Sequence, residues 1–171
     1  MEEKLCIFTG HRTIPHSKYA ALEQVLAQQI TLLAEHGILR FGSGGALGFD
    51  TLAAETVLTL RREMPKIRLS LFLPCREQAR YWSAENQMRY ARLRRLADEV
   101  VFTGDAYTQQ CMYVRNRFMV DRAHLCLAFL EKERGGTAYT VNYAKRRGLA
   151  VINLNDQIPP AEYELPQPQV K

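Results

Sequence analysis

The sequence has no apolar run that approaches the roughly 18 residues of a membrane-spanning helix, so we expect no membrane span. Its first residues, Met1 to Lys4, lack the basic stretch and apolar segment that mark a signal peptide. Only four cysteines occur, and none forms a C-x-x-C pair or lies at zinc-finger spacing from a histidine. We therefore predict a cytoplasmic protein with reduced cysteines, no metal site and no cofactor.

Two familiar nucleotide-binding fingerprints are also missing. A Walker A loop continues from its last glycine into lysine, but Gly48 is followed by Phe49. A dinucleotide-binding G-x-G-x-x-G loop would need glycine at position 47, which is leucine, and it normally follows the first strand of its sheet. The glycine-rich stretch here follows the second expected strand, which argues against a typical NAD-dependent dehydrogenase.

The composition that is present fits one globular domain. The 171 residues are 47% hydrophobic and 24% charged, which is ordinary for a domain with a proper core. The formal net charge of +5 permits an anionic small ligand or a nucleic acid but requires neither.

Strand-like and helix-like segments alternate along the chain. We expect strands at 4–10, 38–43, 67–74, 98–104, 125–131 and 149–154. We expect helices at 17–36, 49–63, 76–97, 107–123 and 137–147, the third with a break near Ser83 as an option. This alternation predicts an α/β three-layer fold, in which a mostly parallel sheet of about six strands carries helices on both faces.

The composition changes near the C-terminal end of the sequence. Four of the seven prolines lie after residue 154. We therefore expect a single domain over residues 1–154 and a proline-rich, extended or disordered tail over 155–171.

Three turns rich in glycine or polar residues follow strands at one edge of the expected sheet. They are TGHR at 9–12, GSGGALGFD at 42–50 and ERGGT at 133–137. Ligands bind beyond the carboxyl ends of strands in open α/β sheets, and glycine-rich turns before helices offer free N–H groups to anions. Three such turns at one edge predict a site for a phosphate or a ribose, with tight packing between strand and helix as the alternative.

Individual residues in the first two turns suggest specific contacts. Arg12 is the first candidate for a phosphate contact, because a guanidinium forms paired, charge-assisted hydrogen bonds; an ordinary surface arginine is the alternative. Asp50 either accepts hydrogen bonds from ribose hydroxyls or caps the helix that begins near Thr51. His11 can bind a ligand or exchange a proton, although such a histidine more often caps a turn.

Two further segments carry candidates. Arg115 and Asn116 lie on the helix before the fifth strand, where they either clamp a phosphate or base edge or serve in packing. Thr137 is expected to cap the following helix, with the N–H groups of Gly135 and Gly136 free for an anion. Aromatic and arginine side chains also alternate over 76–97, which suggests either base stacking or, as we favour, an aromatic stripe on the sheet with solvated arginines.

The motifs TGHR, SGGALGFDTLAAE and VRNRFMVDRAHLCLAFLEKERGGT together resemble the YpsA-like proteins of the SLOG superfamily, over about residues 4 to 154. That superfamily also contains the DNA-processing protein DprA (Smf) and the LOG phosphoribohydrolases. The resemblance implies a Rossmann-like fold with a pocket for a nucleotide or a nucleotide-derived, ADP-ribose-like ligand. The positions that match the family motifs are Gly10, His11, Arg12, Ser43, Gly44, Gly45, Gly48, Asp50, Arg115, Asn116, Gly135, Gly136 and Thr137.

The resemblance leaves three functions open. The first is a nucleotide-binding sensor or regulator, with no membrane partner and with a homo-oligomer left open. The GHR, SGGALGFD and RNR segments are closer to the DprA pattern, which implies single-stranded nucleic acid as an alternative partner. LOG enzymes resemble P-G-G-x-G-T-x-x-E, whereas this chain has Arg134 for the proline and no glutamate after Thr137. A hydrolase of nucleotide N-glycosidic or phosphate bonds is therefore the third alternative, and enzymatic activity stays open.

Overall fold

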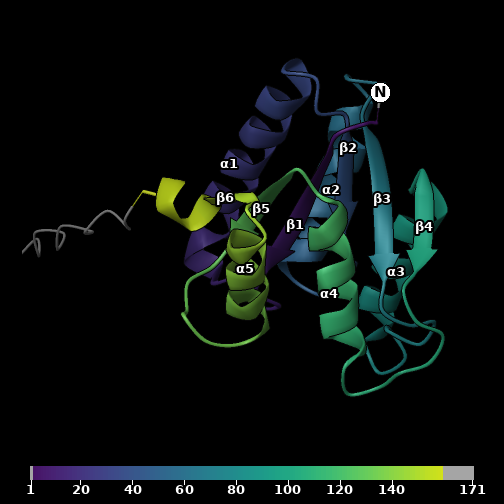
Figure 1. The fold of residues 1–171 in the computed structure, drawn as a ribbon. Helices are drawn as coiled ribbons and strands as arrows, with labels where there is room; N and C mark the ends of the chain where they lie inside the picture. Colours follow the sequence, from purple (N-terminus) through teal and green to yellow (C-terminus); the bar gives the residue numbers. More distant parts are fainter. Residues whose placement is uncertain (1, 160–171) are drawn as a thin grey trace, which may run out of the picture.

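A parallel β-sheet of six strands runs through the centre of the computed structural model, which describes residues 2–159 (Figure 1). The strands are β1 (Leu5–Gly10), β2 (Arg40–Ser43), β3 (Arg68–Leu73), β4 (Glu99–Phe102), β5 (Leu125–Phe129) and β6 (Ala150–Asn153). The central strands read as nearly continuous apolar runs, as in LCLAF of β5, because helices cover both of their faces.

Five helices cover the two faces of the sheet. They are α1 (His16–Glu35), α2 (Phe49–Arg61), α3 (Ala84–Leu96), α4 (Cys111–Arg122) and α5 (Gly136–Arg146). The first three pack side by side on one face, and α4 and α5 pack together on the other (Figure 1). Among residues 2–159, no helix is both long enough and apolar enough to cross a membrane. The predicted three-layer, Rossmann-like α/β fold is confirmed.

Alternating side chains of the strands form two separate cores. In β1, Cys6 and Phe8 belong to the larger core under α1, α2 and α3. Leu5 and Ile7 point the other way, into the smaller core under α4 and α5. This period of two follows from the pleat of a β-strand. It fixes the register of each strand, because a slip by one residue would exchange its two faces. Since all the strands are parallel, their carboxyl ends, and the turns that follow them, lie at one edge of the sheet.

The structure shortens two of the predicted helices at their starts. Residues 76–83 form turns, and α3 begins only at Ala84. Ser83 is its N-cap, with a hydroxyl oxygen that accepts a hydrogen bond of 3.2 Å from the N–H of Asn86. The optional break near Ser83 is therefore the true start of the helix. Likewise, residues 107–110 precede α4 as a loop and turn.

The chain continues to pack after residue 154. Leu154 is fully buried in the larger core, and it opens a short 3-10 helix, η1 (Leu154–Gln157). Lys18 donates a hydrogen bond of 2.9 Å to Asn155 Oδ1, which attaches η1 to α1. The rest of the predicted proline-rich tail, from residue 160 onward, lies outside the described residues.

Candidate functional site

The strand order β4-β3-β2-β1-β5-β6 changes direction between β1 and β5. From β1 the chain adds β2, β3 and β4 outward on one side, and then returns to add β5 and β6 on the other. The connecting helices change faces at the same point (Figure 1). In open α/β sheets, such a switch point leaves a crevice beyond the carboxyl ends of the two strands, where ligands bind.

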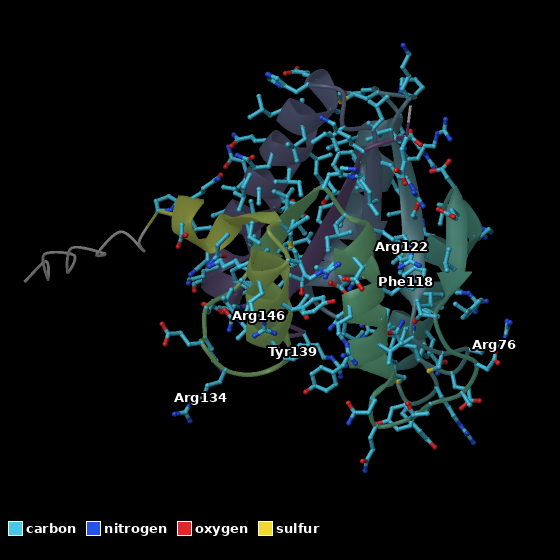
Figure 2. The ribbon with its side chains drawn as sticks, viewed as in Figure 1. Arg76, Phe118, Arg122, Arg134, Tyr139 and Arg146 are labelled. Atoms are coloured by element: carbon cyan, nitrogen blue, oxygen red, sulfur yellow. The ribbon has the colours of Figure 1, made fainter. Side chains whose placement is uncertain are left out.

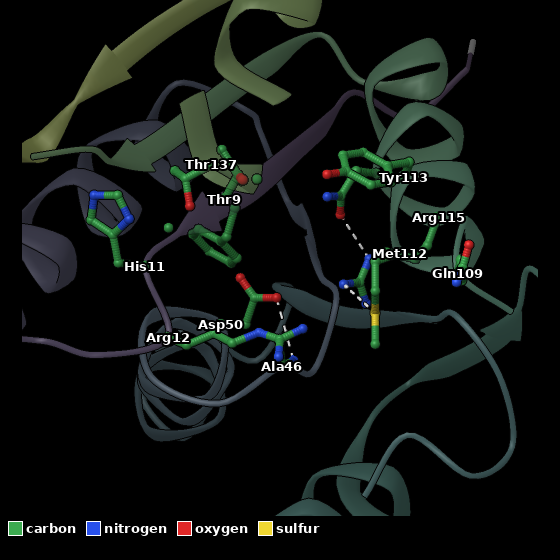
Figure 3. Close-up of a pocket in the computed structure, with 14 residues that line it drawn as sticks. Thr9, His11, Arg12, Ala46, Asp50, Gln109, Met112, Tyr113, Arg115 and Thr137 are labelled. Carbon is green, nitrogen blue, oxygen red and sulfur yellow. Dashed lines mark hydrogen bonds between the residues drawn. The ribbon is translucent and has the colours of Figure 1, made fainter. Parts of the chain in front are cut away.

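A cavity of about 360 Å³ lies at this switch point (Figure 3). Its walls come from the end of β1, the turn before α2, and the N-terminal ends of α2, α4 and α5. The lining residues are Phe8, Thr9, Gly10, His11, Arg12, Ala46, Asp50, Gln109, Met112, Tyr113, Arg115, Asn116, Gly136 and Thr137. Cavities of this size with a few converging polar groups are typical of small-ligand sites.

The structure brings together eight of the thirteen predicted site residues. Those that line the cavity are Gly10, His11, Arg12, Asp50, Arg115, Asn116, Gly136 and Thr137. Those that lie outside its lining are Ser43, Gly44, Gly45, Gly48 and Gly135. Three of these five belong to the turn between β2 and α2, and Ser43 ends β2. This turn therefore contributes less to the cavity surface than its composition suggests.

The glycines of that turn make room for other parts of the same chain. A Cβ on Gly48 would overlap the backbone carbonyl group of Arg12, and φ at Gly48 is 77°, in the left-handed region. A Cβ on Gly44 would lie 2.6 Å from Nη1 of Arg115. The β2–α2 turn is therefore pressed against the β1–α1 turn on one side and against α4 on the other.

Ser43 is committed to holding the same turn in place. Its hydroxyl donates a hydrogen bond of 2.9 Å to the carbonyl oxygen of Asp50 and accepts one of 3.2 Å from the N–H of Gly45. The side chain of Asp50 accepts a further bond of 3.3 Å from the N–H of Ala46. Ser43 thus supports the position of Asp50, and the N-cap of α2 is Gly48 rather than Asp50.

Asp50 is the buried acidic group of the cavity, with only 7% of its surface exposed. Burial raises its pKa to about 6, and the rise is limited by the guanidinium of Arg115, by the N–H of Ala46 and by Arg12. Asp50 therefore changes charge close to neutral pH. Chemically, it can accept hydrogen bonds from hydroxyl groups when ionised, or donate one when protonated. Within residues 2–159, no group of three or more potential metal ligands is present.

Arg115 is held from several sides beneath the cavity. Its Nη1 donates hydrogen bonds to the carbonyl oxygens of Gly44, at 2.6 Å, and Phe72, at 3.3 Å. Its Nε donates to Asn116 Oδ1 at 2.8 Å. The side chain is 3% exposed, and burial lowers its pKa while nearby Asp50 opposes that change. These contacts give Arg115 a packing role, and because it also lines the cavity, its contact with a ligand stays a prediction.

His11 connects the turns that follow β1 and β5. Its Nε2 accepts a hydrogen bond of 2.8 Å from the N–H of Glu131, and its ring lies edge-on to Phe129 at 5.8 Å. Burial lowers the pKa of His11, with Glu131 raising it and Lys132 lowering it. The neutral ring is therefore favoured, and its Nδ1 is the nitrogen left for a ligand.

Two features of the cavity keep free hydrogen-bond donors. The guanidinium of Arg12 is exposed, makes no hydrogen bond or ion pair within residues 2–159, and lies beside Asp50 (Figure 3). Helix α5 starts at Gly136 without a side-chain cap, after Gly135 with φ of 96°. A Cβ on either glycine would meet no atom within 4 Å. Thr137 is therefore not the cap that we predicted, and the first N–H groups of α5 have no partner within the helix.

Three lining residues on α4 and just before it were not among the predicted site residues. Gln109, Met112 and Tyr113 line the cavity together with the predicted Asn116. Their spacing of three, four and seven positions is that of one helix face, which would have identified them once Asn116 was chosen. Tyr113 also packs edge-on against Tyr139 of α5, with ring centres 4.9 Å apart. This contact joins the two helices on either side of the cavity.

The arginines outside the cavity are distributed over the surface and often packed against the protein itself. Arg134 lies just before α5 and Arg146 is the last residue of α5, while Figure 2 shows Arg122 on α4 and Arg76 on the far side of the molecule. Arg76 lies over the Phe102 ring at 4.4 Å, and Arg122 lies over its own helix neighbour Phe118 at 3.3 Å. Within 76–97, Trp82 and Tyr90 pack against the larger core, but Tyr81 is 89% exposed. The favoured aromatic stripe on the sheet is therefore only partly present, and base stacking stays open for the exposed ring.

The raised pKa of Asp50 predicts a specific pH dependence of stability. The pKa is about 6 in the folded protein and 3.8 ordinarily, so the stabilisation from protonated Asp50 is complete below pH 3.8 and is lost as the pH rises through 6. Between pH 7 and pH 5, the wild type should gain about 1 kcal/mol of unfolding free energy relative to Asp50→Asn. Urea denaturation of both proteins across this range measures the difference, and a pH-independent difference would contradict the burial of this charge.

Known proteins related in sequence share most of the chain. The family model described as the YspA SLOG family (YpsA) matches residues 2–153. The uncharacterized SPbeta prophage-derived protein YoqJ of Bacillus subtilis (strain 168) is 30% identical over 136 residues, which cover 72% of this chain and 80% of YoqJ. A UPF0398 protein of Bacillus cereus (strain G9842) is 28% identical over 136 residues, which cover 78% of this chain and 74% of the relative.

Solved structures of two DprA proteins share the fold at low sequence identity. DprA of Streptococcus pneumoniae matches with a TM-score of 0.62 and 18% identity, over 87% of this chain and 49% of that one. DprA of Helicobacter pylori, described for its single-stranded DNA binding mode, matches with a TM-score of 0.63 and 16% identity, over 86% and 63%. This chain thus spans about half to under two thirds of these DprA chains. The predicted resemblance is confirmed: with nearly the whole chain matched by the family model, the protein belongs to the YpsA family of the SLOG superfamily.

Proposed function

We propose that the protein binds a nucleotide or nucleotide-derived ligand at the β1/β5 switch point, with a phosphate at the N-terminus of α5. The observation that carries this proposal is the uncapped start of α5 at a cavity that the free guanidinium of Arg12 also lines. The aligned peptide dipoles make a helix N-terminus partially positive, and its N–H groups point toward a bound anion. A guanidinium adds charge-assisted hydrogen bonds to the same phosphate.

The remaining polar groups of the cavity fit a sugar. Thr9 and Thr137 offer hydroxyls, and Gln109 and Asn116 offer amides that can both donate and accept hydrogen bonds. Asp50 adds an acceptor whose negative charge is balanced by Arg12 and Arg115 nearby. A ribose carries several hydroxyls that need such mixed partners. An ADP-ribose-like molecule is therefore the ligand class that we favour.

Single-stranded DNA is the second candidate, because the H. pylori protein that shares the fold was described for binding it. A DNA phosphate would use the same N–H groups and Arg12. The two candidates differ in salt dependence: a strand that contacts many basic groups releases many counterions, so its affinity falls steeply as salt rises. A mononucleotide confined to one cavity should show a shallow slope.

Arg12→Ala tests the phosphate contact. At about one hundred times its dissociation constant, a ligand should stabilise the wild type by about 2.7 kcal/mol, which raises Tm by several degrees. Because a hydrogen bond to a charged group contributes about 1.5–3 kcal/mol, Arg12→Ala should weaken binding roughly tenfold to a hundredfold. Thermal-shift titration with AMP, ADP-ribose and oligo-dT, at two salt concentrations, measures both affinity and ligand class.

Arg146→Ala is the matched control, because Arg146 is an exposed arginine at the C-terminal end of α5, whereas the cavity lies at the start of that helix. It should bind like the wild type. Equal losses in the two variants would mean that Arg12 acts only through the overall charge. Stabilisation by oligo-dT alone, with a steep salt slope, would favour the DNA candidate over the small nucleotide.

A pair of substitutions at Gly136 tests the contribution of the helix N-terminus. Gly136→Pro deletes one N–H group, and proline fits the first position of a helix because its fixed φ suits that position. Gly136→Ala adds the same Cβ into open space but keeps the N–H group. Titration calorimetry with AMP should show weaker binding to the proline variant than to the alanine variant, by about tenfold. Equal affinities would place the phosphate elsewhere.

A further inference from the structure

A second cavity, of about 500 Å³, adjoins the first. Arg12 and Met112 line both cavities, so the two spaces meet at these side chains. Of the groups proposed to hold the phosphate, only Arg12 lines this second cavity as well. Its remaining wall comes from the β3–α3 connection, with Tyr107 from the β4–α4 connection and Leu47 from the turn before α2.

The second cavity gathers aromatic rings that are unusually exposed. Tyr81 and Tyr107 have 89% and 64% of their surfaces exposed, although they are large and partly apolar. Trp82 is half-buried against the larger core, where it packs edge-on against Tyr90 with ring centres 5.3 Å apart. Two separate connections thus bring three aromatic side chains to one hollow. Exposed apolar groups that gather in this way commonly mark a binding surface.

The polar groups of this cavity suit a flat, weakly polar partner. The Arg80 guanidinium lies 5.4 Å from the centre of the Tyr81 ring, which extends the stacking surface. Gln78 is already bonded to Gly44 and Tyr90, so it supports the wall. Glu77 presents an exposed carboxylate, which accepts hydrogen bonds from N–H groups and repels phosphate.

We infer that this aromatic cavity holds the nucleobase of the ligand whose phosphate occupies the first cavity. The inference rests on the proposed function, because Arg12 lies where the two parts of such a ligand would join. Nucleobases stack on aromatic side chains with little dependence on sequence, and their edges carry N–H groups that suit Glu77. The same chemistry serves a free nucleotide or one unstacked base of a DNA strand.

The test compares ligands with and without a base on proteins with and without the rings. The probes are AMP and ribose 5-phosphate, together with oligo-dT and an abasic oligodeoxynucleotide of the same length. One variant carries Tyr81→Leu and Tyr107→Leu, and the matched control carries Tyr81→Phe and Tyr107→Phe. Both tyrosines are exposed, so neither variant should disturb the core, which thermal unfolding checks. Affinities come from titration calorimetry.

The leucine variant should bind AMP about five- to one hundred-fold more weakly than the wild type, while its affinity for ribose 5-phosphate stays unchanged. The phenylalanine variant should keep most of the AMP affinity. Trp82 is the only tryptophan in the chain, so AMP should also change its fluorescence, whereas ribose 5-phosphate should not. If the ligand is a DNA strand, the leucine variant should lose affinity for oligo-dT but not for the abasic strand. This difference should then be larger than the difference between AMP and ribose 5-phosphate.

Three results would overturn the inference, and each has a different meaning. If ribose 5-phosphate binds in an Arg12-dependent way but AMP binds no more tightly, the phosphate site stands and the base cavity fails. If the leucine variant loses affinity equally for ligands with and without a base, the rings do not contact the base. If no phosphate ligand binds at all, the proposed function fails together with this inference.

Discussion

The buried guanidinium of Arg115 is the interaction on which the arrangement of the site depends. A cation taken out of water must be compensated by acceptors and by opposite charge. Arg115 finds the carbonyl oxygens of Gly44 and Phe72, and it lies close to the carboxyl group of Asp50. These contacts join α4, the β2–α2 turn and the end of β3. They also require glycine at position 44, where a Cβ would collide with Arg115 and Asp50.

The residues of the site fall into two groups: those whose hydrogen bonds and contacts hold the turns together, and those whose hydrogen-bond donors are unused. Ser43, Gly44 and Gly48 serve the close contact of the turns, and His11 joins the ends of β1 and β5. Arg12 and the start of α5 are left with unused donors in the same space. A preorganised set of donors binds an anion without first breaking internal contacts. The side chains that are bonded within the protein therefore hold Arg12 and the start of α5 in place. The aromatic cavity adjoins this site at Arg12.

Much of the fold follows from the sequence, because apolar strands and amphipathic helices alternate and parallel strands must end at one edge. The three motif turns meet for that reason. The contacts of the glycines could not be predicted, because a glycine can make room either for a ligand or for a neighbouring backbone. Gly48 makes room for the backbone of Arg12. Base stacking over 76–97 was kept as an alternative, but the cavity that joins Tyr81 to Tyr107 was not predicted, because residues 76–83 and 107–110 were assigned to helices. Their turns instead carry Tyr81 and Tyr107 to a common hollow, and only tertiary packing decides this.

The most direct test of a phosphate site at the start of α5 is a crystal structure of the protein with AMP bound. The account predicts phosphate oxygens at about 2.7–3.2 Å from the backbone nitrogens of Gly136 and Thr137, with the Arg12 guanidinium on the same phosphate. It also predicts that Arg115 keeps its bond to Gly44. A phosphate bound away from α5 would contradict the account. So would an Arg115 that breaks its hydrogen bond to Gly44 and binds the ligand instead, because Arg115 would then be a binding residue and not a supporting one.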